Sequence, residues 1–169
     1  MQTDLFTQTT GAEFSPCRLW RYTLWRIWDA ERPYCAFIGL NPSTATETEN
    51  DPTVSRCINY ARDWGYGGMY MLNLFAWRAT DPDDMKAADE PVGAENDVAI
   101  LKVAKGAGLV ICAWGNHGAY RDRSKHVRSI LHDAGIAVHC LKTTGSGEPG
   151  HPLYLKANCK PVPYSLRQT

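Results

Sequence analysis

The chain has 169 residues, 44% of them hydrophobic, and its 18 basic residues balance 18 acidic ones. This length suits one domain with a sizeable core. Because the net charge is zero, no overall field draws the protein onto nucleic acid, and such binding needs a local basic patch. The first residues lack the basic and apolar regions of a signal peptide, and no apolar run is long enough to cross a membrane. We therefore expect a cytoplasmic protein with no membrane partner.

The six cysteines are scattered, and no pair has the spacing Cys-x-x-Cys. Three of them lie in apolar, strand-like runs, where cysteine behaves as a small hydrophobic residue. This pattern favours reduced thiols over a metal or iron–sulfur site. We expect neither a metal nor a cofactor.

The N-terminal half begins with a polar segment, residues 1–16, that we expect to be a flexible arm. A single α/β domain then spans 17–169. Residues 18–28 are rich in alternating β-formers and predict a strand. After a break, residues 34–40 form an uncharged apolar run, typical of a strand buried on both faces. The two strands together predict a hairpin, with the first as an antiparallel edge.

The rest of the chain alternates between helical and strand-like segments. Helices are predicted at 52–64, 95–105 and 124–133, and strands at 69–76, 109–114 and 136–141. Uncharged strands that alternate with helices indicate a parallel sheet covered on both faces. Right-handed crossovers bring the carboxyl ends of parallel strands to one edge of the sheet. Polar residues after the strands should therefore meet there, where open α/β sheets bind ligands.

Two asparagines stand out at this edge. Asn41 follows the buried strand in the turn Asn41-Pro42-Ser43. It can orient a water molecule or bond a substrate, but Asn-Pro is also a common turn former. Asn73 lies in an apolar strand, where a buried amide needs hydrogen-bond partners. It either reads a ligand's edge or bonds a neighbouring loop.

Two histidines, His117 and His151, lie on loops at the same edge. His151 is the stronger candidate because Gly150 and Pro152 restrain it, and its imidazole could stabilise negative charge on a substrate oxygen. Asp51 and Asp81 each precede a proline, which indicates a helix cap, and either could instead be a general base. A basic cluster follows the third buried strand and is either a solvated helix face or a phosphate contact. Its members are Arg121, Arg123, Lys125 and Arg128.

Four segments, read in order, resemble motifs of the uracil–DNA glycosylase superfamily. They are Gly39-Leu40-Asn41-Pro42-Ser43, Met71-Leu72-Asn73-Leu74-Phe75, Leu109-Val110-Ile111-Cys112-Ala113-Trp114-Gly115 and His151-Pro152-Leu153-Tyr154-Leu155. The first is similar to the form found in mismatch-specific glycosylases, where Asn replaces the catalytic Asp of the main uracil enzymes. The resemblance implies a three-layer α/β/α fold with a four-stranded parallel sheet, here with an N-terminal antiparallel edge strand or hairpin.

The resemblance also implies roles for individual residues. Asn41 positions water, Asn73 reads the base edge and His151 stabilises the departing base anion. Asp51 lies outside the four matching segments, and our separate hypothesis is that it supplies the missing carboxylate. Leu153, Tyr154 or Leu155 would wedge into a duplex. The remaining substrate contacts expected are Gly39, Leu40, Pro42, Ser43, Phe75, Trp77, Arg78 and His117, with phosphate contacts at Arg121, Arg123 and Lys125.

The whole chain also resembles an uncharacterised bacterial and phage family, catalogued as a domain of unknown function, through Leu-Asn-Pro-Ser-Thr-Ala and His-Pro-Leu-Tyr motifs. We expect an enzyme that acts on the N-glycosidic bond of a plain or modified pyrimidine in DNA or a nucleotide, without an obligate protein partner. Two alternatives remain. The chain could be a non-catalytic nucleotide- or modified-base-binding module, or a nucleotide-modifying enzyme that uses the same pocket.

Overall fold

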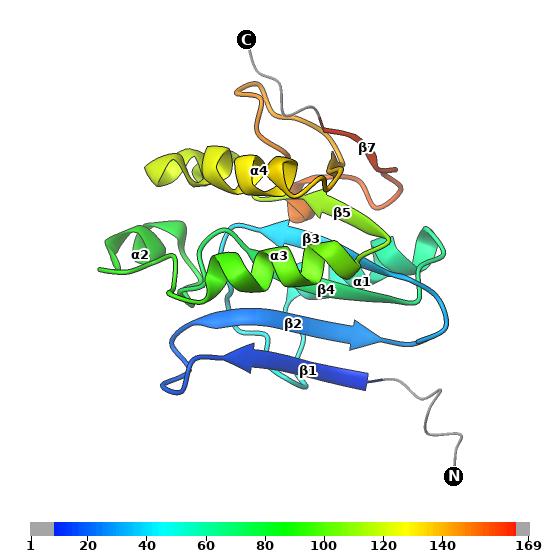
Figure 1. Cartoon of the computed structure of the whole chain (residues 1–169), viewed down its shortest axis with the longest axis horizontal. Helices are drawn as coiled ribbons and strands as arrows, with labels where there is room; N and C mark the ends of the chain where they lie inside the picture. Colours follow the sequence, from blue (N-terminus) through cyan, green and yellow to red (C-terminus); the bar gives the residue numbers. More distant parts are fainter. Residues whose placement is uncertain (1–8, 165–169) are drawn as a thin grey trace.

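The computed structural model describes residues 9–164, and its strands form one seven-stranded sheet in the order β1-β2-β4-β3-β5-β6-β7 (Figure 1). Strands β4, β3, β5 and β6 pair in parallel, whereas β1, β2 and β7 join through antiparallel pairs. The strands are β1 Thr9–Phe14, β2 Arg21–Ile27, β3 Tyr34–Gly39, β4 Gly68–Asn73, β5 Leu109–Cys112, β6 His139–Cys140 and β7 Val162–Pro163. The protein is therefore a mixed α/β protein with one central sheet.

Helices cover both faces of this sheet (Figure 1). They are α1 Pro52–Asp63, α2 Pro82–Ala87, α3 Asn96–Gly106 and α4 Arg123–Asp133, with 3-10 turns η2 Asn116–Asp122 and η3 Pro152–Tyr154. The three helices predicted from sequence are present within about two residues of their expected ends. The predicted caps are confirmed: Asp51 accepts from the N–H of Val54, and Asp81 accepts from the N–H of Asp83.

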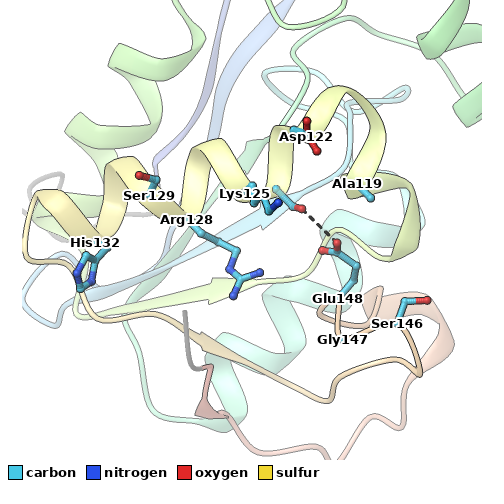
Figure 2. A pocket seen from close by; sticks show the side chains of 10 residues that line it. Ala119, Asp122, Lys125, Arg128, Ser129, His132, Ser146, Gly147 and Glu148 are labelled. Carbon is cyan, nitrogen blue, oxygen red and sulfur yellow. Dashed lines mark hydrogen bonds between the residues drawn. The ribbon is translucent and has the colours of Figure 1, made fainter. Parts of the chain in front are cut away.

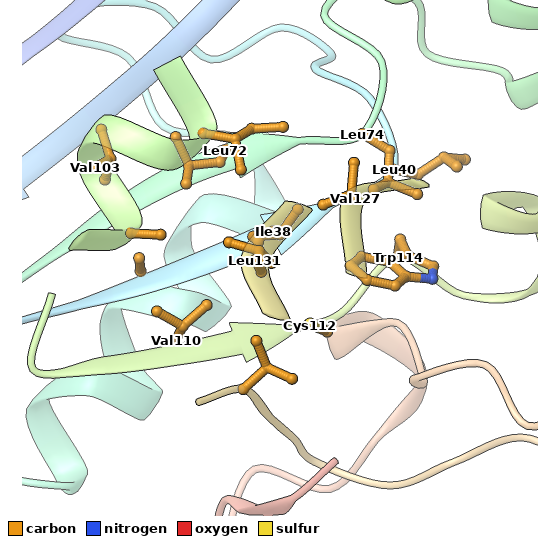
Figure 3. Packing of buried hydrophobic residues seen from close by; sticks show 14 of the residues in the cluster. Ile38, Leu40, Leu72, Leu74, Val103, Val110, Cys112, Trp114, Val127 and Leu131 are labelled. Atoms are coloured by element: carbon orange, nitrogen blue, oxygen red, sulfur yellow. The ribbon is translucent and has the colours of Figure 1, made fainter. Parts of the chain in front are cut away.

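Two hydrophobic layers, one on each face of the sheet, follow from the alternation of side chains along the uncharged strands. On β3, Cys35 and Phe37 pack with α1, whereas Ala36 and Ile38 pack with α3 and α4. Figure 3 shows the second layer, in which Ile38, Leu72 and Val110 of three neighbouring strands meet Val103, Val127 and Leu131 of the helices. The central strands are thus fixed by burial on both faces.

Two expectations for the N-terminal region were wrong. Strand β2 pairs with β1 and β4, not with β3, because β3 takes parallel partners on both edges. Residues 9–14 form the edge strand β1 instead of an arm, and the rest of the predicted arm, residues 1–8, lies outside the described residues. Gly11 lets β1 approach the ring of Trp25, since a Cβ there would lie 2.3 Å from Trp25 Cζ2.

The carboxyl ends of β3, β4 and β5 lie at one edge of the sheet. The connection after β3 passes through α1 on one face, and the connection after β5 passes through α4 on the other. Connections that leave neighbouring strands toward opposite faces open a crevice at this edge. Within residues 9–164, no helix has the length and apolarity needed to span a membrane.

Candidate functional site

A small cavity lies at the carboxyl edge, beneath the turn that follows β3. Eight predicted site residues line it: Gly39, Leu40, Asn41, Pro42, Ser43, Asp51, Asn73 and His151. Arg21, Thr53, Val54 and Met71 complete the lining. The cavity has a volume of about 40 Å³, which is room for water and far below the roughly 300 Å³ of small ligand pockets. A base can enter only if the cavity widens.

Gly39 and Asn73 are neighbours across the parallel pair β3–β4. Asn73 is 3% exposed, and its backbone carbonyl accepts from Nδ2 of Asn96. A Cβ at position 39 would lie 3.1 Å from Asn73 Nδ2 and 2.7 Å from Met71 Cε. The absence of a side chain at Gly39 therefore leaves the space that the Asn73 amide occupies.

Asn41 connects the turn after β3 to the loop after β4. Its Nδ2 lies 2.8 Å from the carbonyl oxygen of Ala79, 3.1 Å from that of Pro42 and 3.5 Å from that of Trp77. Since the nitrogen is committed to these carbonyls, the group that Asn41 has left to offer the cavity is Oδ1, an acceptor. Asn41 thus has the turn-forming role, and it retains one polar atom for a ligand or water.

Asp51 lies at the start of α1, at the side of the cavity. Its Oδ1 accepts from Val54 N at 2.9 Å, and its Oδ2 accepts from Ala45 N at 3.3 Å. Each carboxylate oxygen can accept about two hydrogen bonds. Asp51 therefore keeps acceptor positions for a water molecule while it caps the helix.

His151 reaches the cavity from the far end of the chain. The loop that carries it is held to the end of β5, where Gly115 N–H donates to the carbonyl of Pro149 at 2.8 Å. Its Nδ1 accepts from Leu153 N–H at 3.2 Å, so the proton of the neutral ring is on Nε2. Burial lowers the pKa of His151 below its ordinary value, and the charge of Asp51 opposes this shift only in part. His151 is thus a neutral imidazole with one N–H donor.

Arg21 is the charged residue among the four lining residues that were not predicted as site residues. Its guanidinium comes from β2 and is 2% exposed. It donates to Asn73 Oδ1 at 3.2 Å and to the carbonyl of Ala45 at 3.3 Å. A charged residue at an inward position of an aromatic-rich strand is the signal that could have identified it.

Five predicted substrate contacts lie outside the cavity lining. Phe75 is buried against Tyr120, and Trp77 packs edge-on against Trp20 with 5.1 Å between ring centroids. Arg78 donates to the carbonyl of Arg18 at 3.0 Å. Neither aromatic ring is therefore placed to stack on a base in the cavity as it stands.

The other two of the five lie nearer the surface. His117 Nδ1 is 2.9 Å from the amine of Lys86. Leu153 is 39% exposed beside His151, and the neighbouring Tyr154 is 85% exposed. The loop that carries His151 therefore presents two apolar side chains to solvent.

The three predicted phosphate contacts lie in three different environments. Arg123 is buried and bonds the carbonyl of Leu74 and the carboxylate of Asp97, the latter at 2.7 Å, so it stabilises the fold. Arg121 is exposed, with its guanidinium 5.5 Å from the centre of the Tyr120 ring. Lys125 instead lines a second cavity.

This second cavity lies between α4 and the 144–148 turn and has a volume of about 760 Å³. Figure 2 shows Lys125, Arg128 and His132 along one side of α4, facing the turn that carries Glu148. Glu148 accepts from the Trp114 indole at 2.8 Å and from Ser124 Oγ at 3.2 Å. Glu148, one of the two acidic residues of this cavity with Asp122, is therefore hydrogen-bonded to protein groups. No group of three or more His, Cys, Asp or Glu side chains in residues 9–164 is placed to hold a metal ion.

The fold and the cavity define an α/β protein with a polar site at the carboxyl ends of parallel strands. A family model described as "Protein of unknown function (DUF1643)" matches residues 21–153, and the chain belongs to this family. No curated protein and no solved structure matches the chain. The matched segment contains every residue that lines the site cavity.

Proposed function

We propose that this protein is an enzyme that hydrolyses the N-glycosidic bond of a plain or modified pyrimidine base, in DNA or a nucleotide, in the manner of uracil–DNA glycosylases. The observation that carries the proposal is the meeting of Asn41, Asp51 and His151 at one cavity. These residues come from three separate parts of the chain. A water-orienting acceptor, a carboxylate and a neutral N–H donor are the groups that such a hydrolysis needs.

The chemistry assigns one role to each group. The bond between the sugar C1′ and the base nitrogen breaks, and its electron pair leaves with the base. The His151 Nε2–H donates to a base oxygen that gains negative charge. Asn41 Oδ1 and the Asp51 carboxylate hold the water that adds to C1′, and Asp51 takes its proton. Asn73 reads the base edge.

For a duplex substrate, the base must leave the stack to reach the cavity. The exposed side chains of Leu153 and Tyr154 lie directly after His151 and suit the role of a wedge. We assign the contact with a backbone phosphate to Lys125, which lines the second cavity and is exposed on α4. If DNA is the substrate, Lys125→Glu weakens oligonucleotide binding and reduces its salt dependence, and leaves nucleotide binding unchanged.

The test is base release, read by mass spectrometry, from single- and double-stranded oligonucleotides and nucleotides that contain uracil, mismatched thymine or modified pyrimidines. Asn41→Ala and His151→Ala should lose release by about a hundredfold or more. Asn116→Ala and His117→Ala are matched controls, because these residues lie at the same edge but do not line the site cavity. Full release by the first two variants contradicts the proposal.

A non-catalytic base-binding module is the second candidate, and one observation favours it. The Asn41 amide nitrogen is already used to fix the loop after β4. This structural role by itself explains why the chain has an asparagine at position 41, without any catalytic role. Tight binding of a pyrimidine nucleotide with no product from any substrate would support this candidate.

A further inference from the structure

We propose that Arg21 is a positioning residue that makes the site select a pyrimidine carrying negative charge on its ring. The inference rests on the proposed function, because it names the form in which that site holds its base. Three observations carry it: the incomplete hydrogen bonding of Arg21, the absence of an ion-pair partner, and the orientation that Arg21 gives to Asn73.

The first observation is the contrast between Arg21 and Arg26, two buried arginines of the same strand. Arg26 donates to five oxygens, including the carbonyls of Thr46 and Glu49 and the side chain of Asn50. Arg21 makes two long hydrogen bonds, and its buried Nε has no partner. The hydrogen bonds of Arg26 hold the loop before α1, and this structural role explains why Arg26 is buried. The two hydrogen bonds of Arg21 do not explain its burial in the same way.

The second observation concerns charge. No ion pair among residues 9–164 involves Arg21, in contrast to Arg18, Arg32 and Arg123. Asp51 is the acid whose charge favours the Arg21 guanidinium, while Arg26 and Arg78 oppose it. Burial lowers the pKa of Arg21 to about 10, which still leaves it charged at neutral pH. A buried cation that has no ion-pair partner within the protein is complemented by an anionic ligand.

The third observation is the orientation of Asn73. Because Arg21 donates to Oδ1 of Asn73, the amide nitrogen is turned toward the space beside Gly39. Asn73 Nδ2 and His151 Nε2 are therefore the N–H donors that these two lining residues have left to offer, and the charged Arg21 lines the same cavity. Acceptors at Asn41 and Asp51 serve the water. A pyrimidine whose oxygens and ring nitrogen share a negative charge complements this arrangement.

The experiment compares two free bases of similar shape: 5-nitrouracil, whose ring is ionised near neutral pH, and thymine, which is neutral. We expect the wild-type protein to bind 5-nitrouracil at least about tenfold more tightly than thymine in calorimetric titrations. Arg21→Gln should reduce this ratio to about twofold or less, and Arg21→Lys should retain most of it. A merely structural role would weaken both ligands equally and leave the ratio unchanged.

Arg62→Gln is the control for the change in net charge, because Arg62 is exposed and does not line the site cavity. It should keep the wild-type ratio. The proposal is overturned if the wild-type protein binds neither base, if its ratio is near one, or if folded Arg21→Gln keeps the wild-type ratio. If circular dichroism shows that Arg21→Gln is unfolded, the proposal is tested by the affinity ratio of the wild type and by that of Arg21→Lys.

The inference and the proposed function fail in different ways. Anion selectivity that depends on Arg21, with no base release from any substrate, would refute the hydrolase and keep the role of Arg21. Base release with a wild-type ratio near one would refute the role of Arg21 and keep the hydrolase.

Discussion

Asp51 combines a structural and a proposed chemical role, and substitutions can separate the two. Asp51→Ala removes the helix cap on Val54 N–H, which contributes about 0.5–2 kcal/mol. It also leaves the N–H of fully buried Ala45 without its acceptor, at about 1–3 kcal/mol. Together we expect a loss of about 1.5–5 kcal/mol in the free energy of unfolding. For a chain of this size, this lowers Tm by roughly 3–20 °C.

Asp51→Asn keeps most of the cap, because Asn is as good at this position as Asp. Its amide accepts at only one atom, so the Ala45 N–H loses its partner. We expect Asp51→Asn to retain about 1 kcal/mol more stability than Asp51→Ala. Both variants should lose base release, because neither can take the proton of the attacking water.

Urea denaturation and the mass-spectrometric release assay measure the two effects on the same samples. Asp81→Ala is the matched control, because Asp81 caps α2 through Asp83 N–H at 2.9 Å but does not line the cavity. It should lose about 1 kcal/mol and keep wild-type release. Wild-type release by Asp51→Asn would show that Asp51 is not the base. Unchanged stability in Asp51→Ala would show that the two hydrogen bonds of Asp51 do not stabilise the fold.

Three further substitutions test the cavity and the fold. Gly39→Ala places a Cβ 3.1 Å from Asn73 Nδ2, so base release should fall at least about tenfold and stability by about 1–3 kcal/mol. Arg123→Met breaks the ion pair between a buried guanidinium and a carboxylate that is 40% exposed, and it removes a donor to the Leu74 carbonyl, so it should cost about 1–3 kcal/mol in urea denaturation without weakening oligonucleotide binding. His151 has a lowered pKa when folded, so below pH 6.5 the unfolded chain binds more protons. Its stability contribution is therefore present above pH 6.5 and is lost as the pH falls through the folded pKa, a loss that His151→Asn should not show.

Each of these substitutions has a control in the chain. Gly145→Ala should change neither release nor stability, because nothing lies within 4 Å of the added Cβ. Arg121→Met removes an exposed arginine and should leave the free energy of unfolding within about 0.5 kcal/mol of wild type. His117→Asn is the control for replacing an imidazole, because His117 lies at the same edge of the sheet but does not line the site cavity. If a control substitution has the same effect as the test substitution with which it is paired, the role that we assign to the tested residue is wrong.

Much of the fold could be predicted from local patterns. The uncharged runs at 34–40 and 109–114 are central strands because both of their faces must avoid water. The Asp-Pro pairs at 51 and 81 begin helices because an aspartate side chain satisfies free N–H groups at a helix start. Strand β1 was not predicted, because its six residues are largely exposed and carry no strong hydrophobic alternation.

The candidate site, like the fold, could be predicted from the sequence only in part. The position of the polar residues after β3 and β4 at one edge of the sheet could be predicted from local patterns, because parallel strands align their carboxyl ends. Which side chains enter the cavity depends on contacts between distant segments. Phe75 turned into the core and Arg123 paired with Asp97, whereas Arg21 met an amide 52 positions away. Hydrophobic period and capping act within a few residues, but a buried charge is placed by the packing of distant segments.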